Sequence, residues 1–313
     1  MTQMQLIFLG TGGSWPTIKR NVTSIAIKRG GEVVLFDCGE GTQRQLQKSQ
    51  ISYMQIKKIF ISHFHGDHFL GLPGLIQTMQ LNDRKDPLFI YGPKGLFELM
   101  EQILNLGYFK PAYQIIVKEV ESNDVIHFDS YDIEVLSVSH GVPTLAYALI
   151  EHLRPGKFNK KKALELGVPE GPSFSKLQKG TPIKLDDGTI IKPEMILGPP
   201  RLGRKIVYSG DTRYYEDMIS FAENADALIH EGTFDSSLQD IAYQYGHSTA
   251  KDAAEIAKKA KVKILFITHV SPRYLDHKEL LKEAQKFFKN VIIPKDFQME
   301  TIQLPKSKNN GIE

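Results

Sequence analysis

The sequence of 313 residues contains very little cysteine and no long apolar run. Cys38 is the single cysteine, so no disulfide bond can form within the chain, which is typical of proteins from reducing compartments. The apolar run at residues 6–9 is too short for a signal peptide, and no run reaches the roughly 18 apolar residues of a spanning helix. We therefore expect a cytoplasmic protein with no membrane contact.

Positive charge is concentrated in one segment. The chain has a formal net charge of +3, but residues 151–192 carry +4 and the remainder carries −1. The basic residues of this segment are Arg154, Lys157, Lys160, Lys161, Lys162, Lys176, Lys179, Lys184 and Lys192. The composition predicts a single domain over residues 1–313 with an inserted, flexible basic arm over residues 152–192. Such an arm is either a solvated lysine-rich loop or a surface for nucleic acid.

The rest of the chain alternates between strand patterns and helical patterns. Strands are predicted over residues 5–9, 22–28, 33–36, 57–62, 88–91, 205–208, 227–230, 262–268 and 291–293. Helices are predicted over residues 42–48, 69–81, 95–106, 214–223, 250–260 and 277–288. Residues 117–138 are expected to form an antiparallel meander of three strands, continued at 145–151. Two sheets with helices on their outer faces satisfy this order, so we expect an α/β protein with a four-layer αβ/βα sandwich and a protruding arm.

A loop of six residues after one predicted strand is rich in groups that bind metals. His63, His65, Asp67 and His68 offer imidazole and carboxylate ligands, which suit zinc. One tetrahedral ion cannot easily take four ligands from so short a loop. In an extended segment the first three of these side chains share one side and His68 points to the other. A tight turn at Gly66 would instead divide the four ligands between two metals.

Three further candidate ligands each follow a predicted strand: His140, Asp211 and His269. Active sites collect at strand ends because the sheet fixes the backbone while the loop frees the side chain. Together with the histidine loop they make seven ligands, enough for two metals with three private ligands each and one shared carboxylate. Two ions roughly 3.5–4 Å apart can hold a bridging hydroxide and assist displacement at phosphorus.

The order His-x-His-x-Asp-His, then an isolated His, an Asp and a C-terminal His, resembles the metallo-β-lactamase superfamily. This resemblance implies the αβ/βα sandwich and two zinc ions per subunit. It implies one zinc bound by His63, His65 and His140, a second bound by Asp67, His68 and His269, and a bridging Asp211. It also implies that Asp37 supports the ligands without binding metal.

Three other segments resemble the ribonuclease Z family, in its short form. Residues 230–233 (His-Glu-Gly-Thr) and 246–249 (Gly-His-Ser-Thr) resemble paired motifs of that family, and residues 167–172 (Gly-Val-Pro-Glu-Gly-Pro) resemble the Gly-Pro motif of its arm. The resemblance implies a zinc-dependent endoribonuclease that removes the 3′ trailer from precursor tRNA by attack of metal-bound hydroxide. The products would be a tRNA 3′-hydroxyl and a 5′-phosphorylated trailer.

The same resemblance favours the nucleic-acid interpretation of the arm, and it implies a homodimer in which the arm of one subunit serves the active site of its partner. Lysines that contact phosphates give affinity that depends on salt rather than on sequence. The expected substrate-binding residues are Lys157, Lys160, Lys161, Lys162, Gly171, Pro172 and Arg273. For Arg273, an ordinary surface charge is an equal alternative.

Catalytic roles are expected for three residues. Asp67, besides binding metal, is expected to accept a proton from the attacking water. His247 is expected to protonate the departing 3′ oxygen or to bind the phosphate, with Glu231 as its partner by family resemblance. A neighbouring carboxylate favours the charged form of a histidine. His230 is either structural or part of the site's lining.

One loop departs from the family pattern. Residues 16–21 read Pro-Thr-Ile-Lys-Arg-Asn, whereas the family usually has Pro-x-Lys-x-Arg-Asn, so the lysine has moved by one place. The family's loop is associated with rejecting tRNAs that already end in CCA. The sequence therefore does not predict that this discrimination is kept.

Three alternatives stay open at this stage. A hydrolase of the same superfamily acting on a small phosphodiester, thioester or sulfate ester would keep the metals and give the arm no role. A non-catalytic RNA-binding protein with a relict metal site is disfavoured because all seven ligands are present. A redox diiron centre usually needs a carboxylate where His65 stands.

Overall fold

The computed structural model describes residues 3–305, whose contacts group them into two units. Unit 1 joins the chain up to Ile150 with Lys205–Gln303, and unit 2 is Glu151–Arg204. Each unit has its own apolar core. Within residues 3–305, no helix has both the length and the apolar character needed to cross a membrane.

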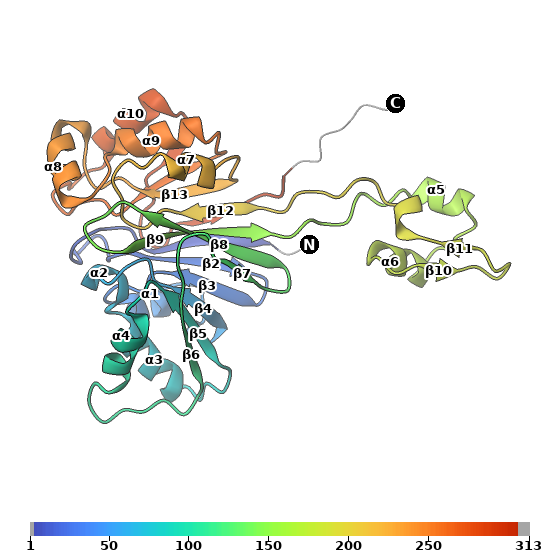
Figure 1. Ribbon diagram of the computed structural model, residues 1–313, viewed down its shortest axis with the longest axis horizontal. Coiled ribbons are helices and arrows are strands. Elements are labelled where there is room, and N and C mark those ends of the chain that lie inside the picture. Colours follow the sequence, from blue (N-terminus) through green and yellow to red (C-terminus); the bar gives the residue numbers. More distant parts are fainter. Residues whose placement is uncertain (1–2, 306–313) are drawn as a thin grey trace. The chain divides into compact units, whose positions relative to one another are not determined.

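The first large sheet of unit 1 has the strand order β16-β1-β2-β3-β4-β5-β6 (Figure 1). Its strands are β1 (Met4–Gly10), β2 (Ser24–Arg29), β3 (Glu32–Phe36), β4 (Ile56–Phe60), β5 (Leu88–Gly92), β6 (Ile115–Glu119) and β16 (Met299–Thr301). Strands β1 to β3 pair antiparallel, and the turn between β2 and β3 includes Gly30, which has φ 61°. Strands β3 to β6 pair parallel, so each needs a crossover connection.

The second large sheet has the order β15-β14-β13-β12-β9-β8-β7. Its strands are β7 (Val125–His127), β8 (Tyr131–Val138), β9 (Thr144–Glu151), β12 (Lys205–Tyr208), β13 (Ala227–Glu231), β14 (Leu265–Thr268) and β15 (Val291–Ile292). Strands β12 to β15 pair parallel, and β12 pairs antiparallel with β9. The parallel strands are again separated in sequence by helices, as crossovers require.

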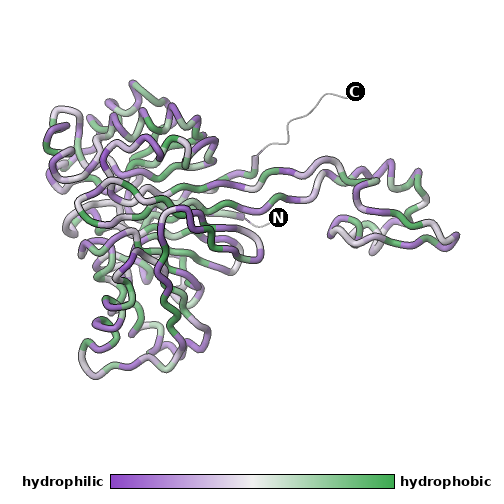
Figure 2. The backbone as a smooth tube through the Cα atoms, viewed as in Figure 1, coloured by the Kyte–Doolittle hydropathy of each residue, from purple (hydrophilic) through white to green (hydrophobic). Residues whose placement is uncertain are grey.

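Helices cover the outer face of each sheet, so unit 1 has four layers (Figure 1). One face carries α1 (Thr42–Lys48), α3 (Leu72–Leu81) and α4 (Leu96–Leu104), and the other carries α7 (Asp217–Phe221), α9 (Ala250–Lys259) and α10 (Lys278–Phe287). Between the sheets lies a core rich in aromatic rings, among them Phe36, Phe60 and Tyr147. Hydrophobic segments accordingly concentrate in the strands (Figure 2). The predicted αβ/βα sandwich is confirmed.

The predicted meander over residues 117–138 is wrong. β6 pairs in parallel with β5 in the first sheet, whereas β7 and β8 form a hairpin in the second. The alternation of apolar residues identified three strands, but it does not identify their partners. The crossover through α4 brings β6 beside β5 before the chain passes to the other sheet.

The predicted helix over residues 69–81 is two helices, α2 (Gly66–Phe69) and α3, with a break at Gly71. A Cβ atom at Gly71 would lie 2.2 Å from the backbone oxygen of Gly39, so the chain can pass this loop only with glycine there. Two described elements of unit 1 have no counterpart in the sequence prediction: α8 (Gln239–Tyr245) and the edge strand β16. Single 3₁₀ turns occur at η1 (Tyr53–Gln55) and η3 (Ser236–Leu238).

Unit 2 contains more regular structure than its composition indicated. It comprises α5 (Lys160–Glu165), α6 (Pro172–Gln178), β10 (Ile183–Lys184), β11 (Ile190–Ile191) and the turn η2 (Pro193–Met195). Its buried apolar residues are Ala163, Val168, Leu177, Ile191 and Ile196. Arg154 and Arg201 exchange two backbone hydrogen bonds of 2.8 and 2.9 Å, and the buried ion pair of Glu151 with Arg204 lies next to them in the chain. The predicted arm, residues 152–192, lies within this unit.

Candidate metal centre

The seven predicted ligands all belong to unit 1 and lie where strands end. His63 and His65 follow β4, and Asp67 and His68 occupy the first turn of α2. The other three ligands follow β8, β12 and β14: His140, Asp211 and His269. The predicted turn at Gly66 is confirmed, because α2 begins there and ends the extended segment. His63 and His65 group with His140, and Asp67 and His68 group with His269, while His63 and His68 also both lie close to Asp211.

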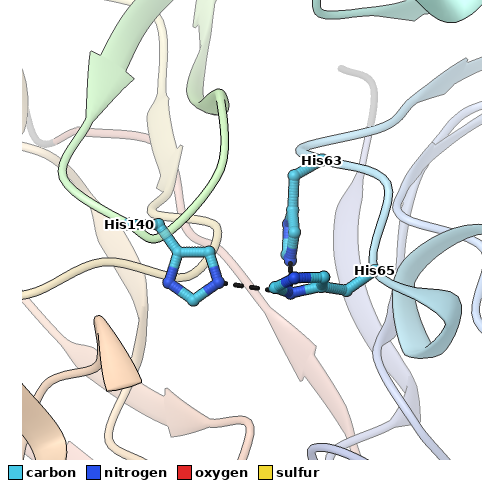
Figure 3. A group of neighbouring side chains, drawn as sticks. All are labelled: His63, His65 and His140. Carbon is cyan, nitrogen blue, oxygen red and sulfur yellow. Dashed lines mark hydrogen bonds between the residues drawn. The ribbon is translucent and has the colours of Figure 1, made fainter. Parts of the chain in front are cut away.

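Three histidines form the first group (Figure 3). Nδ1 of His65 lies 3.0 Å from Nε2 of His63 and 3.3 Å from Nε2 of His140. Burial lowers the pKa of each of the three imidazoles, which favours their neutral forms. Three neutral ring nitrogens directed at one point are the donors that a borderline divalent cation prefers.

Asp67, His68 and His269 form a second group. Oδ2 of Asp67 lies 3.2 Å from Nε2 of His269 and 3.7 Å from Nε2 of His68. Burial raises the pKa of Asp67, but the hydrogen bond from His269 and the charge of His68 outweigh it and hold this pKa well below its usual range. The carboxylate is therefore ionised and available as a ligand.

Asp211 connects the two groups. Its Oδ2 lies 3.7 Å from Nε2 of His63 in the first group, and 3.2 Å from Nε2 of both His68 and His269 in the second. Only 2% of the Asp211 surface is exposed. Burial raises the pKa of Asp211, but the charges of the neighbouring His269 and His68 outweigh burial and hold this pKa well below its usual range. The carboxylate is therefore ionised although it is buried.

Asp37, predicted to support the ligands, does so through four hydrogen bonds. Its Oδ2 lies 2.7 Å from Nδ1 of His68 and accepts from the hydroxyls of Tyr208 and Ser62 at 2.6 and 2.8 Å. Its Oδ1 accepts from the backbone N–H of Ser62 at 2.6 Å. The carboxylate is fully buried and in contact with one ligand histidine, so it fixes the ring of that ligand without facing the centre.

The chemistry of His68 tests whether the centre suits a cation. Its Nε2 is buried and makes no hydrogen bond within the described part of the chain, although Asp211 Oδ2 is 3.2 Å away. Burial lowers the pKa of His68, but the carboxylates of Asp211 and Asp37 raise it well above the ordinary value. The two carboxylates thus favour a positive charge next to Nε2 of His68. A metal ion bound by this set of imidazoles and carboxylates would supply that charge.

His247 and Glu231 form the predicted pair beside the centre. Nδ1 of His247 lies 2.8 Å from Oε1 of Glu231, and its ring stacks on His269 with centroids 5.2 Å apart. Glu231 also accepts from Thr212 and Thr233 and is fully buried. Burial lowers the pKa of His247, but the Glu231 carboxylate outweighs burial and raises it to about 9. His247 therefore carries a proton at neutral pH.

Some contributors to the site were missed by the sequence. Ser14 donates its backbone N–H to Oδ2 of Asp67 at 2.6 Å, and Thr233 Oγ1 lies 2.9 Å from Nδ1 of His269. The carbonyl of Gly246 lies 2.7 Å from Nδ1 of His140. Thr233 and Gly246 belong to the motifs at residues 230–233 and 246–249, so their position in the sequence could have indicated that they lie in the site. Ser14 acts through its backbone, and no side-chain pattern reveals it.

The remaining predicted residues lie in two places. Arg273 is exposed and packs over the ring of Phe234 at 4.8 Å, and that ring contacts His247 with centroids 6.2 Å apart. His230 is fully buried, with Nδ1 2.7 Å from the carbonyl of Glu231. The predicted arm contacts belong to unit 2, where the three consecutive lysines begin α5, and Gly171 precedes Pro172 at the start of α6 with φ 117°.

Comparison with known proteins identifies the family. Residues 4–152 match the family of the anti-Pycsar protein Apyc1, and residues 195–270 match the beta-lactamase superfamily domain. The chain is 50% identical over 294 residues to ribonuclease Z of Methanosarcina acetivorans, covering 94% of this chain and 96% of that one. It is 46% identical over 300 residues to ribonuclease Z of Pyrococcus horikoshii, covering 96% of each. The chain belongs to the ribonuclease Z family.

The fold supports this assignment. The crystal structure of human tRNase Z, short form, matches with a TM-score of 0.71 and 28% identity, covering 96% of this chain and 100% of that one. As a member of the ribonuclease Z family, the chain is an endoribonuclease that processes the 3′ ends of tRNA. The cluster of imidazole and carboxylate groups in its metallo-β-lactamase fold indicates that it depends on metal.

Proposed function

We propose that this ribonuclease Z family member removes the 3′ trailer from precursor tRNA with two zinc ions held by the seven predicted ligands. The observation that carries the proposal is Asp211, whose single oxygen Oδ2 lies within 3.7 Å of ring nitrogens from both groups. Bound zinc would supply an activated water and neutralise charge on the phosphate. The products would be a tRNA 3′-hydroxyl and a trailer with a 5′-phosphate.

Asp67 is the proposed acceptor of the proton from the attacking water. Its side chain is oriented from two sides, by the backbone N–H of Ser14 at 2.6 Å and by Nε2 of His269 at 3.2 Å. About a tenth of the side chain is exposed, so it borders both the ligand cluster and the solvent from which substrate arrives. A group in that position can bind metal and accept a proton.

His247 is the proposed donor of a proton to the departing 3′ oxygen. The ring borders the cluster through His140 and His269, with centroids 5.0 and 5.2 Å apart, and 14% of the side chain remains exposed. Because Glu231 occupies Nδ1, Nε2 is the nitrogen left to face the substrate. Arg273, held over Phe234 nearby, is proposed to contact a phosphate of the same strand.

The decisive experiment incubates the purified protein with a 3′-extended tRNA, with and without a chelator, and maps the new ends. We expect one cut that leaves a 3′-hydroxyl, loss of cutting with chelator, and recovery when zinc is returned. Metal analysis of the protein should give two ions per chain. Cutting that persists in chelator, or a 3′-phosphate end, would contradict the proposal. Cleavage only of small phosphodiesters or esters would favour the superfamily hydrolase instead.

Unit 2 is proposed to be the tRNA-binding arm. Lys157 and Lys162 form no ion pair with any residue in the described range, whereas Lys160 pairs with Glu170 at 3.0 Å. Exposed, unpaired lysines on one small unit suit contacts with RNA phosphates, and such binding weakens steeply with salt. Gly171 and Pro172, at the start of α6, are proposed to lie in the same contact surface. We further propose a homodimer in which each arm serves the partner's site, and a cytoplasmic location.

A further inference from the structure

A group of apolar side chains lies exposed beside the metal centre. Trp15, the chain's single tryptophan, is 62% exposed, and Ile18 and Leu275 are exposed even more fully. Large apolar side chains on a surface commonly mark a binding site when they are contiguous. These three all line one groove.

The groove has a volume of about 480 Å³ and lies between the loop at residues 12–20 and the loop at residues 270–277. Its apolar walls are Trp15, Pro16, Ile18, Pro272, Tyr274 and Leu275. A cavity of this size with a flat aromatic side chain suits a planar ring system.

Backbone contacts connect both walls of the groove to the metal ligands. The N–H of Ser14 donates to Asp67, and Ser14 adopts φ 68°, an unusual conformation for a residue with a side chain. Gly13 donates to the carbonyl of Val270, the residue directly after His269, at 3.2 Å. A Cβ atom at Gly13 would lie 2.5 Å from Cε1 of His269, so this loop packs directly on a ligand ring. Trp15 therefore directly follows a residue, Ser14, that is bonded to a predicted metal ligand.

A second hollow, of about 1100 Å³, shares residues 16–20 with the groove and is bordered by exposed cations. Lys19, Arg44, Lys48 and Lys295 line it, and none of the four forms an ion pair within residues 3–305. Of the three acids in its lining, Asp276 pairs with Lys278 at 3.0 Å, Asp296 accepts hydrogen bonds from Thr11 and Asn21, and the third is Glu40. The hollow is thus suited to anions.

We propose that the groove binds an unpaired nucleobase next to the scissile phosphate, with Trp15 as its stacking surface and the cationic hollow holding the phosphates that follow. Stacking on aromatic rings beside a positively charged channel is how proteins hold single-stranded nucleic acid without reading its sequence. This inference depends on the proposed function. The base belongs either to the trailer or to the last nucleotide of the tRNA, and both offer the same chemistry.

The single tryptophan makes the test direct. We would add to the zinc-loaded full chain a precursor tRNA in which a CH₂ group replaces the leaving 3′ oxygen, so that it binds without being cut. Trp15 fluorescence is expected to be quenched in step with binding measured by anisotropy. Two further precursors carry an abasic nucleotide, one at the first trailer position and one at the last tRNA position. Loss of quenching with one of them supports the proposal and assigns the base.

Variants give a second measurement. Because base stacking on an aromatic ring is worth roughly 1–3 kcal/mol by alanine substitution, Trp15→Ala is expected to raise the KM for precursor tRNA about tenfold with kcat little changed. Trp15→Phe should keep most of the affinity. Tyr108→Ala, which removes a fully exposed ring elsewhere in unit 1, is the matched control and should behave as wild type.

The outcomes separate this inference from the proposed function. If the unmodified precursor is neither bound nor cut, the proposed function fails. If it is bound and cut while Trp15 fluorescence is unchanged, or while both abasic precursors quench fully, the stacking site alone is overturned. A fluorescence change that follows protein concentration without RNA would make the groove an interface between copies and would also overturn it. Equal KM values for Trp15→Ala and Tyr108→Ala would have the same consequence.

Discussion

At the scale of single residues, four of the predicted ligand histidines are held in the same way. Nδ1 of each ring has a neighbour that fixes it, so that Nε2 faces the cluster. The four partners are the Ser62 hydroxyl, the Asp37 carboxylate, the Gly246 carbonyl and the Thr233 hydroxyl. Such contacts set the tautomer and the orientation of a ligand before metal arrives. His65 differs, because its Nδ1 faces the cluster.

The sequence revealed the ligands more readily than their supports. The seven predicted ligands are chemically distinctive and follow strands, so their spacing was informative. A hydroxyl or a carbonyl that supports a ring can come from almost any residue, and nothing in the sequence distinguishes Ser62 from other serines. The sequence also does not reveal the backbone conformation at the site. Asp37 and His269 adopt φ 58° and 55°, which is unfavourable for residues with a side chain and is maintained only by the surrounding structure.

Asp37 provides a test of ligand support. Asp37→Asn keeps the shape of the side chain but removes the charge that faces His68, so we expect zinc affinity to fall by about 10–100-fold. Competition with a chromogenic chelator measures this directly. Asp132→Asn, at a carboxylate that lies 2.9 Å from the exposed His127, is the control and should leave affinity unchanged. Unchanged zinc affinity in Asp37→Asn would show that this carboxylate is only a packing element.

His247 provides a test of the proton donor. His247→Ala is expected to retain its zinc and to slow precursor cleavage by about 10²–10⁴-fold, the range for loss of general acid catalysis. Glu231→Gln should show a smaller loss of rate. The His247 ring stays in place, but it no longer has the carboxylate charge that raises its pKa. Metal analysis and single-turnover cleavage are the measurements. His127→Ala serves as the control, and near-normal turnover in His247→Ala would remove it from the mechanism.

At the scale of elements, the position of the proposed proton donor, His247, depends on how helix α9 begins. His247 lies three residues before the first residue of α9, and Thr249 caps that helix. The Thr249 hydroxyl accepts from the N–H of Asp252, whose carboxylate accepts in return from the N–H of Thr249. A cap of this kind can be recognised in a sequence, because Ser, Thr and Asp at these positions are a local signal. The partner of β6 was not predictable in this way, since strand pairing depends on distant residues.

Removing this cap is expected to lower the stability of the protein more than its rate of cleavage. Thr249→Ala removes the hydroxyl that accepts from the N–H of Asp252, so this N–H at the start of α9 loses its partner and we expect the free energy of unfolding to fall by about 1 kcal/mol. Urea denaturation followed by circular dichroism measures the change. Thr249→Ser keeps the hydroxyl and should lie close to wild type. If the two variants lose equal stability, the methyl packing of Thr249 matters and the cap does not.

At the scale of the whole molecule, the chain combines a catalytic unit and a basic unit that have separate cores. The charge pattern located unit 2 but gave no sign of its helices, because five buried apolar residues are too few to produce a periodic pattern over this length. This separation allows unit 2 to be shortened without touching the metal ligands.

Shortening unit 2 tests its proposed role. Arg154 and Arg201 form an isolated antiparallel bridge through two backbone hydrogen bonds, so residues 155–200 can be replaced by Asn-Gly, which favours a tight hairpin turn. We expect precursor tRNA binding at moderate salt to be lost, while hydrolysis of bis-p-nitrophenyl phosphate and zinc content are kept. Processing of precursor tRNA at the wild-type rate would show that the arm has another purpose.

Mixed subunits test whether the arm acts on the partner's site. The shortened chain has the metal centre but no arm, and His247→Ala has the arm but an impaired centre. If the arm serves its partner, a dimer of one of each places an intact arm at an intact centre, so mixing the two inactive proteins should restore cleavage to about a quarter of the wild-type level. That fraction follows because half of randomly mixed dimers are hybrids with one working site. If the arm serves its own site, mixing restores nothing, since every intact centre then lacks its arm.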